Sequence, residues 1–352
     1  MPVKMAVIGM GGMAGWHYKN ITKSVPNIQV VGAYDIREEA KAGIDELGIK
    51  NYKSPEEIYK DKEIDLVLIA TPNDVHKSYS IACLESGKHV LCEKPVTLNT
   101  AEFDEIVAVA NKTGKIFTVH QNRRWDSDYL TVRKILGDGI LKDLYRIETR
   151  VQGSRQLVHG WRGYKVNGGG MVLDWGIHLL DQLLDLFPQQ KIKSIHAHFH
   201  QIVMPEVEDD FTALLLLDNG VSAVVNVAMS SFILQPRWHL FAKNGSAQIL
   251  NWDCEGEIIR LSDTNEMEWA ENIVYTSAGP TRSMAPRPKS TVDTLPLPVV
   301  EGDWLDLHRN LIDAIAGKTE PIVTHAQARR CMQVVDAIFE SARSGASVTC
   351  NI

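Results

Sequence analysis

Two short segments of the chain contain the residue types that proton transfer requires. Asp174 and His178 are four residues apart, so on a helix they would share one face. A carboxylate raises the basicity of a neighbouring imidazole, and histidine titrates near neutral pH, so His178 is a candidate general base for a hydroxyl proton. Lys94 stands between an apolar run and a proline, and its charge would stabilise a developing alkoxide. We predict these three as catalytic residues; the alternatives are a surface pair and a plain turn.

The start of the chain has the pattern of a dinucleotide-binding turn. The apolar run at residues 4–8 leads directly into Gly9-Met10-Gly11-Gly12-Met13-Ala14-Gly15. In such a turn the first glycine permits a tight bend, the second lets the backbone approach a pyrophosphate, and a small residue near the end allows close packing of helix on strand. The N-terminus of the helix then presents N–H groups to the anion. The predicted cofactor-binding residues here are Gly9, Gly11, Gly12, Met13 and Ala14.

An acidic residue at the end of the second predicted strand favours NAD over NADP. Asp35 lies twenty residues after Gly15, where a carboxylate accepts hydrogen bonds from the adenosine ribose and repels a 2′-phosphate. Arg37 would stack on adenine or bind a 2′-phosphate, so NADP is not excluded. The alternative for Asp35 is an ordinary turn residue at a strand end.

The elements that must position these residues divide the chain into two parts. Short apolar strands alternate with helices over residues 1–121, as in a Rossmann fold with a doubly wound parallel sheet. Strands then lengthen over residues 122–352 and predict an α+β domain with an open-faced, mostly antiparallel sheet and a helix at about 171–187. Residues 262–300 contain five prolines and little periodicity, and we interpret them as a long excursion or arm. Helices at about 303–316 and 325–344 complete the chain and would pack back toward the first domain.

Further polar residues follow strands of the first part, at the sheet edge where ligands bind in open α/β sheets. Thr71, Pro72 and Asn73 come after the apolar run DLVLIA, with His76 just beyond them, and Glu93 precedes Lys94 after HVLC. We predict that these residues contribute to cofactor binding, although proline also marks ordinary turns.

The order and spacing of these motifs resemble the Gfo/Idh/MocA family, named for glucose–fructose oxidoreductase and inositol dehydrogenase. The glycine turn, Thr-Pro-Asn, Glu-Lys-Pro and Gly-Gly-Gly…Asp-x-x-x-His carry the resemblance, which spans nearly the whole chain. It implies that Lys94, Asp174 and His178 match the family's catalytic set, and that the open sheet face forms a homodimer or homotetramer. It also implies an NAD(P)-dependent dehydrogenase that oxidises a secondary alcohol of a sugar, a sugar derivative or an inositol.

The resemblance is less specific for the residues that would bind substrate. The segment His120–Asp126 resembles the part of sugar- and cyclitol-specific members that contacts substrate, and a second group lies before the glycine run. The residues predicted to bind substrate, besides Asp174 and His178, are Arg124, Trp125, His159, Trp161, Arg162 and Lys165. Surface or interdomain packing is the alternative for each. Two other functions stay open: a sugar-processing oxidoreductase that recycles bound NAD(H), and a non-catalytic dinucleotide sensor.

Composition excludes several other classes of partner. The net charge of −7 and the absence of a long basic run disfavour nucleic acid and anionic membranes, and no apolar stretch is long enough to span a bilayer. The five cysteines are scattered, and the apolar start is too short for a signal peptide, so we expect reduced thiols and a cytoplasmic location. His196, His198 and His200 would share one face of a strand, but three histidines at this spacing bind zinc only with unusual backbone geometry, and no nearby carboxylate or cysteine motif supports a site. We therefore predict an interface or solvent face there, and no metal site.

Overall fold

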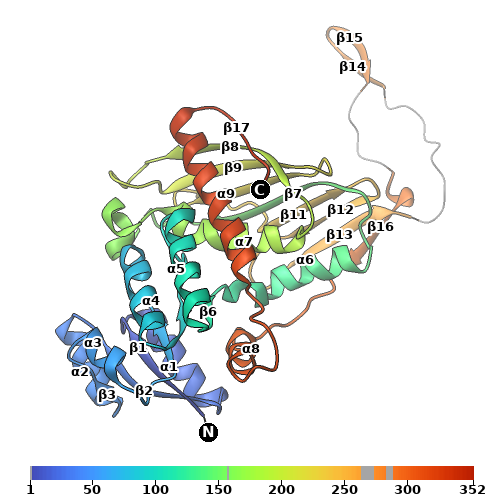
Figure 1. The fold of residues 1–352 in the computed structure, drawn as a ribbon. Helices are drawn as coiled ribbons and strands as arrows, with labels where there is room; N and C mark the ends of the chain where they lie inside the picture. The colour runs from blue at the N-terminus through green and yellow to red at the C-terminus, as the bar shows by residue number, and fades with distance from the viewer. Residues whose placement is uncertain (1, 157, 263–272, 283–287) are drawn as a thin grey trace.

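The structure is a computed structural model that describes residues 2–156, 158–262, 273–282 and 288–352. Two sheets and the helices around them share one continuous hydrophobic core (Figure 1). Among the helices of these residues, none has both the length and the apolar composition that crossing a bilayer requires.

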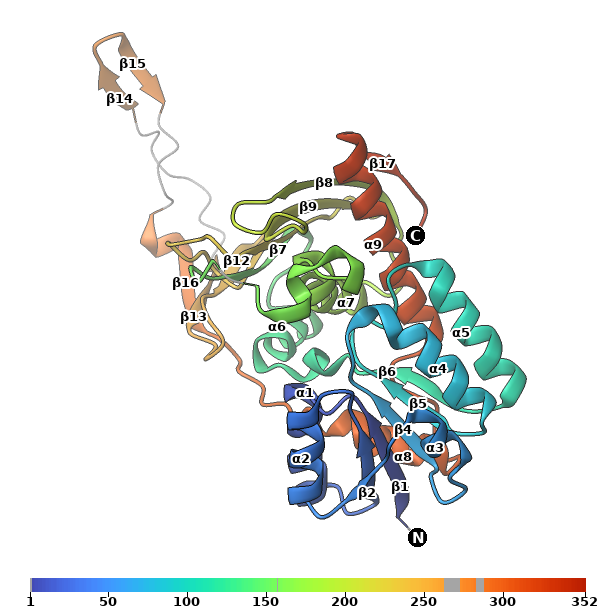
Figure 2. The same cartoon turned by 90° about the vertical axis from the view of Figure 1, so that its left-hand side faces the viewer.

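The first sheet has six strands in the order β3-β2-β1-β4-β5-β6, and all neighbours are parallel. Helices α1 and α2 lie on one side of the sheet and α4 and α5 on the other (Figure 2). The prediction of a doubly wound parallel sheet is therefore confirmed. Because both faces are covered, β4 is apolar and buried throughout. The strands are β1 (Val3–Ile8), β2 (Ile28–Tyr34), β3 (Lys50–Asn51), β4 (Leu66–Ile69), β5 (His89–Cys92) and β6 (Phe117–Val119). The helices are α1 (Gly12–Ser24), α2 (Glu38–Glu46), α3 (Pro55–Lys60), α4 (His76–Glu85) and α5 (Thr100–Thr113).

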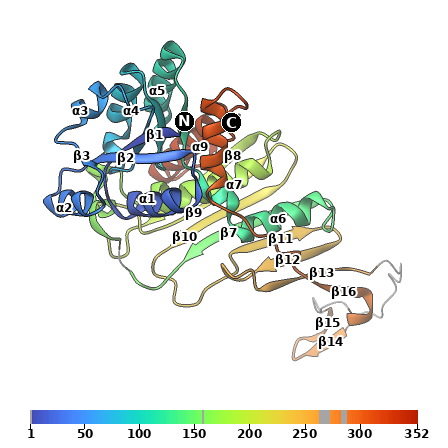
Figure 3. The ribbon, with the colours of Figure 1, turned by 90° about the horizontal axis from the view of Figure 1, so that it is seen from below.

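The second sheet has nine strands in the order β16-β13-β12-β11-β7-β10-β9-β8-β17. Only β7 and β10 pair in parallel, so the sheet is mostly antiparallel, as predicted. Helices α6, α7 and α9 lie over one of its faces (Figure 3). The strands are β7 (Leu144–Gln152), β8 (Ile192–His200), β9 (Asp210–Leu217), β10 (Ser222–Ala228), β11 (Trp238–Ala242), β12 (Gly245–Ile249), β13 (Gly256–Leu261), β16 (Val292–Pro296) and β17 (Val348–Thr349). The helices are α6 (Ser127–Gly137), α7 (Ile177–Leu186) and α9 (His325–Ser344).

The other face of this sheet carries exposed side chains, several of them apolar. On β9 buried and exposed residues alternate, which leaves Leu214 and Leu216 exposed. His196 on β8 pairs with Leu214, and His198 and His200 follow it on the same face. The histidine triplet therefore faces outward from the uncovered side of the sheet.

The last part of the chain returns to the first sheet. Helix α8 (Asp306–Ile315) brings His308 into contact with His17 of α1. Further along, the Thr118 hydroxyl of β6 donates to the Val323 carbonyl at 3.1 Å, and Arg329 of α9 donates to the Asp104 carboxylate of α5 at 2.7 Å. The six-stranded sheet and its helices therefore contact residues 308–329, which lie far from them in sequence.

Two local features differ from the sequence predictions. Residues 262–300 are not only an arm: their described part holds the hairpin β14 (Ile273–Thr276) and β15 (Gly279–Arg282), and β16, which joins the second sheet. The helix expected at about 171–187 begins with a π-helical turn, Val172–Gly176, before α7.

Candidate active site

The glycine turn leaves the backbone at the start of α1 accessible to a ligand. Gly9 has φ +91°, and a Cβ there would lie 2.6 Å from the Ala70 carbonyl oxygen, so only glycine fits. A Cβ at Gly12 would meet no described atom within 4 Å, and one at Gly11 only the Arg37 guanidinium at 3.9 Å. No side chain caps α1, so its first N–H groups are free for an anion. These features fit a dinucleotide pyrophosphate, for which the sequence predicted this turn.

Asp35 is buried at the end of β2 and is already fully engaged. Its Oδ2 accepts from the Met10 N–H at 2.7 Å and from Arg37 Nη2 at 2.9 Å, and its Oδ1 accepts from the Arg37 N–H and Nε at 2.9 and 3.0 Å. Burial opposes ionisation, but the bonds from Arg37 and Met10 and the Arg37 charge together lower the pKa of Asp35. An ionised carboxylate therefore lies beside the glycine turn, and the Arg37 side chain folds over it.

Two adjoining cavities extend along the carboxyl edge of the first sheet. The outer cavity, of about 460 Å³, includes Gly9, Asp35, Arg37 and Pro72 in its lining. The central cavity, of about 400 Å³, lies between the two sheets. Gly11, Gly12, Ala70, Thr71 and Trp161 line both, so the two form one continuous groove. The predicted site residues in the lining of the central cavity are Gly11, Gly12, Met13, Thr71, Asn73, Glu93, Lys94, Trp161, Arg162, Asp174 and His178.

In the central cavity, Lys94 and Asp174 form an ion pair between the two halves of the chain. Lys94 Nζ, just after β5, donates to Asp174 Oδ1 at 2.9 Å and to the Asp174 carbonyl at 3.0 Å. Arg162 Nε donates to the same carboxylate oxygen at 3.1 Å. Burial raises the pKa of Asp174, but the two cations outweigh this effect, so the pKa is lowered and the residue is ionised.

His178 lies on the same cavity wall but is not held by Asp174. The Asp174 carboxylate bonds Lys94 and Arg162 instead, because two cations attract it more strongly than a neutral ring does. The Nδ1 atom of His178 has no hydrogen-bond partner among the described residues. Burial, and then the charges of Lys94 and Arg123, lower the pKa of His178 well below its usual value. The ring is therefore neutral at neutral pH and open to a ligand in the cavity.

Of the two adjacent arginines, the structure brings Arg123 to the cavity and not Arg124. The guanidinium of Arg124 is buried and forms a bidentate pair with Asp181 at 2.7 Å, which removes it from contact with a substrate. Arg123 lines the cavity, with its guanidinium carbon 4.4 Å from the ring centroid of Trp175 and 5.2 Å from that of Trp304. The prediction for Arg124 is thus corrected by one residue: consecutive residues of this 3₁₀ turn lie about 120° apart around its axis, so the two side chains point in different directions.

Several other predicted residues lie outside the two cavities. Trp125 packs against the core, His159 is exposed, and Lys165 lines a separate cavity with Glu206. Ala14 is buried against the sheet and so serves packing. His76 bridges the carbonyl oxygens of Thr71 and Pro95 at 3.0 and 2.8 Å, which ties together the two loops rather than reaching the groove.

The glycine run before Asp174 serves close packing of protein on protein. A Cβ at Gly168 would lie 2.2 Å from Leu98 Cδ2, and the Gly168 carbonyl accepts from Asn73 Nδ2 at 2.7 Å. Asn73 therefore both lines the central cavity and docks the second half of the chain onto the first.

Five residues of the central cavity lining were not among the predicted site residues: Ala70, Asn122, Arg123, Trp175 and Trp304. Asn122 and Arg123 lie within the segment His120–Asp126, and Ala70 and Trp175 adjoin predicted residues, so a local signal existed for four of them. Trp304 precedes α8 and reaches the site only through the return of the chain, for which no local pattern exists.

Comparisons with known proteins show the family to which the chain belongs. Residues 3–121 match an oxidoreductase family with an NAD-binding Rossmann fold, and residues 129–248 match the C-terminal domain of the same Gfo/Idh/MocA family. A solved structure of an NAD-binding protein from Listeria innocua is 36% identical, covers 99% of each chain and has a TM-score of 0.94. The scyllo-inositol 2-dehydrogenase (NADP+) IolW of Bacillus subtilis is 28% identical over 82% of this chain and 79% of its own. Myo-inositol 2-dehydrogenase of Thermotoga maritima is 27% identical over 69% of this chain and 75% of its own. The chain therefore belongs to the Gfo/Idh/MocA family of oxidoreductases and has its NAD-binding Rossmann fold.

Proposed function

We propose that the protein is an NAD(P)-dependent dehydrogenase that oxidises a secondary alcohol of a sugar, a sugar derivative or an inositol. The observation that carries the proposal is the meeting of Lys94 and His178, from opposite halves of the chain, in one cavity that continues into the dinucleotide groove. The two inositol dehydrogenases named above support the substrate class, since their names place the reaction at a ring hydroxyl carbon.

The residues of the cavity have separate roles in this proposal. Neutral His178 accepts the hydroxyl proton through a ring nitrogen, which its low pKa keeps unprotonated. Lys94 donates a hydrogen bond to the same oxygen as negative charge develops on it, while Asp174 holds the ammonium in position. When bound, NAD+ would supply the hydride acceptor for the substrate carbon, and Gly11, Gly12 and Asp35 would hold it in the groove.

The rest of the lining fits a polyhydroxylated ring. Trp161, Trp175 and Trp304 offer flat apolar faces for its C–H groups, and Arg123 and Arg162 offer donors for its hydroxyls. These five residues are proposed to bind substrate; Arg124, Trp125, His159 and Lys165 are not.

Cofactor preference is part of the same proposal. The ionised Asp35 favours NAD, because its carboxylate repels a 2′-phosphate and accepts from ribose hydroxyls. Since Arg37 occupies the carboxylate, NAD binding would require the exposed Arg37 side chain to give up part of its pairing.

The test is an assay of the full chain against a panel of inositols, sugars and glycosides with NAD+ and with NADP+. Reduction of free cofactor by at least one polyol, with NAD+ preferred, is the expected result. No reduction with any polyol would overturn the proposal. If cofactor instead co-purifies and never exchanges while the sugar is still processed, the alternative with internally recycled NAD(H) replaces it.

We further propose that the protein forms homodimers or homotetramers through the uncovered face of the nine-stranded sheet, and that it is cytoplasmic. The exposed apolar Leu214 and Leu216 support the first point, and the five free thiols fit a reducing compartment. Light scattering of the wild type and of Leu216→Glu tests the interface: a monomeric wild type, or a variant with unchanged mass, would contradict it. Fractionation of the source cells tests the location.

A further inference from the structure

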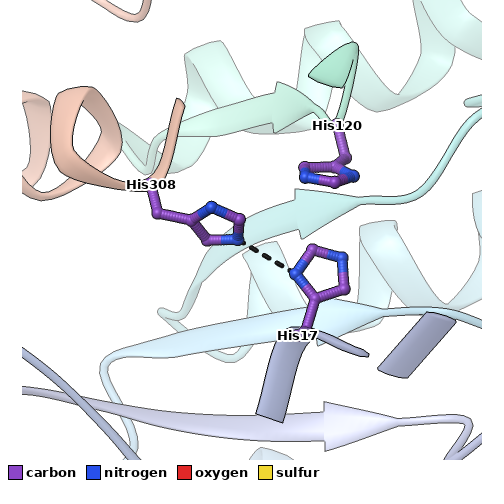
Figure 4. A group of neighbouring side chains, drawn as sticks. All are labelled: His17, His120 and His308. Atoms are coloured by element: carbon purple, nitrogen blue, oxygen red, sulfur yellow. Dashed lines mark hydrogen bonds between the residues drawn. The ribbon is translucent and has the colours of Figure 1, made fainter. Parts of the chain in front are cut away.

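Three buried histidines from distant parts of the chain meet behind the catalytic lysine. His17 comes from α1, His120 from the segment after β6, and His308 from α8 (Figure 4). All three side chains are 0% exposed, and each offers a ring nitrogen within 4.8 Å of the others. The ring centroids are 4.3 Å apart for His17 and His120 and 5.0 Å apart for His17 and His308.

A buried carboxylate lies beside two of these rings. Glu93 is 6% exposed, and its Oε1 lies 2.8 Å from His17 Nε2 and 2.9 Å from His120 Nδ1. The cluster therefore combines three imidazole rings with one carboxylate, all of them away from solvent.

The third ring completes the cluster but does not satisfy all of its ring nitrogens. His308 Nε2 lies 2.9 Å from His17 Nδ1. His308 Nδ1 and both ring nitrogens of His120 are buried and have no hydrogen-bond partner among the described residues. Buried polar atoms normally have such a partner, so these three nitrogens require an explanation.

A cation between the rings would supply the missing partner. Zinc binds imidazole nitrogen at about 2.0–2.1 Å, which places two nitrogens of a tetrahedral site about 3.3 Å apart. The 2.9 Å between His17 Nδ1 and His308 Nε2 is within a few tenths of an ångström of this value, and since the ligand atoms all lie within 4.8 Å of one another, the remaining separations need to close by at most about 1.5 Å. Histidine ligands of zinc characteristically donate their other N–H to a carboxylate, and Glu93 Oε1 lies within 2.9 Å of both His17 Nε2 and His120 Nδ1.

We propose that His17, His120 and His308 bind one divalent transition-metal ion, of which Zn²⁺ fits best, and that Glu93 accepts hydrogen bonds from two of the ligands. The site is structural rather than catalytic, since none of its three ligands reaches either cavity of the groove. It joins α8 to α1 and β6 and fixes Glu93, whose neighbour in the chain is Lys94. It is independent of the substrate class proposed above.

The test measures metal binding and not activity. Full-length, tag-free protein is stripped with a chelator and titrated with Zn²⁺, Co²⁺ and Mg²⁺. The background is the triple variant His196→Gln, His198→Gln, His200→Gln, which removes the exposed histidines as an alternative site. Expected are one Zn²⁺ per chain in this background, a rise in melting temperature with Zn²⁺ but not Mg²⁺, and tetrahedral ligand-field absorption with Co²⁺.

Two further variants identify the ligands. His308→Asn removes one ligand and should abolish tight binding, and Glu93→Gln should weaken it by roughly 10–100-fold. If either variant does not fold, X-ray absorption at the zinc edge of the background protein must show imidazole nitrogens as ligands. Absence of bound metal in the background protein, zinc without imidazole scattering, or unchanged affinity in a folded His308→Asn would each overturn the proposal.

Discussion

Replacing Lys94 with methionine removes the ammonium from the central cavity and keeps most of the side-chain volume. In the wild type this ammonium lies 2.9 Å from Asp174 Oδ1, and both side chains are largely buried, at 14% and 18% exposed. The variant leaves Asp174 with Arg162 as its remaining partner, at 3.1 Å. The carboxylate therefore stays paired, and the free energy of unfolding should fall by about 1–3 kcal/mol, between the values for exposed and buried pairs.

The effect on turnover should be much larger than the effect on stability. If Lys94 donates to the substrate oxygen in the transition state, its loss should lower kcat by about 10²–10³-fold, or about 2.7–4 kcal/mol. Cofactor affinity should be mostly retained, because the outer cavity with Asp35 does not include Lys94.

The measurement combines steady-state kinetics on the best polyol of the panel with a fluorescence titration of NADH. Lys134→Met is a matched control, since Lys134 also pairs with a carboxylate, Asp138 at 2.8 Å, but on the exposed surface of α6. A folded Lys94→Met enzyme with kcat within about tenfold of the wild type would refute the assigned role of the lysine.

Four other substitutions test further features of the structure. Asp35→Ser should weaken NADH binding by about 10–100-fold and improve NADPH binding, because it removes the ribose acceptor and frees Arg37 for a phosphate; isothermal titration with both cofactors measures this. Glu208→Gln tests a buried carboxyl group, because burial raises the pKa of Glu208 to about 7. As this group ionises between about pH 5 and pH 8, the free energy of unfolding of the wild type should fall by about 2–3 kcal/mol. Urea titrations at several pH values should show this fall in the wild type and not in the variant. Arg124→Ala should lower the free energy of unfolding by about 3–5 kcal/mol, because it leaves a carboxylate buried and unpaired, whereas Arg123→Ala should mainly raise KM; equal effects of both on KM would contradict the correction made above.

The fold could be predicted wherever one local pattern determines the outcome. Apolar strands that end in glycine or in Thr-Pro-Asn predict a parallel sheet and its ligand-binding edge. A strand that is apolar throughout must be buried on both faces, and this is typical of a parallel sheet with helices on both sides. Helix α6 and strand β13 were missed, since neither has flanking signals as clear as the glycine turn.

The site residues were harder to predict where their positions depend on tertiary packing and not on a local pattern. The 3₁₀ turn at Asn122–Trp125 determines whether Arg123 or Arg124 faces the cavity. Composition does not determine how this turn is rotated about its axis. The spacing of Asp174 and His178 correctly suggested a shared wall, but the stronger partners of Asp174 come from Lys94 and Arg162, whose approach depends on tertiary packing. The buried histidine cluster has no local signature, because its members are at positions 17, 120 and 308.

The return of the chain through α8 and α9 has a consequence for synthesis on the ribosome. His17 and Thr118 are translated early, yet their partners His308 and Val323 are translated 291 and 205 residues later. Until then, the nascent nucleotide-binding half exposes polar groups and apolar surface that the finished protein buries. A gene fragment that encodes only the first 121 residues should therefore yield aggregating product, and co-expression with the missing C-terminal segment should rescue it in trans.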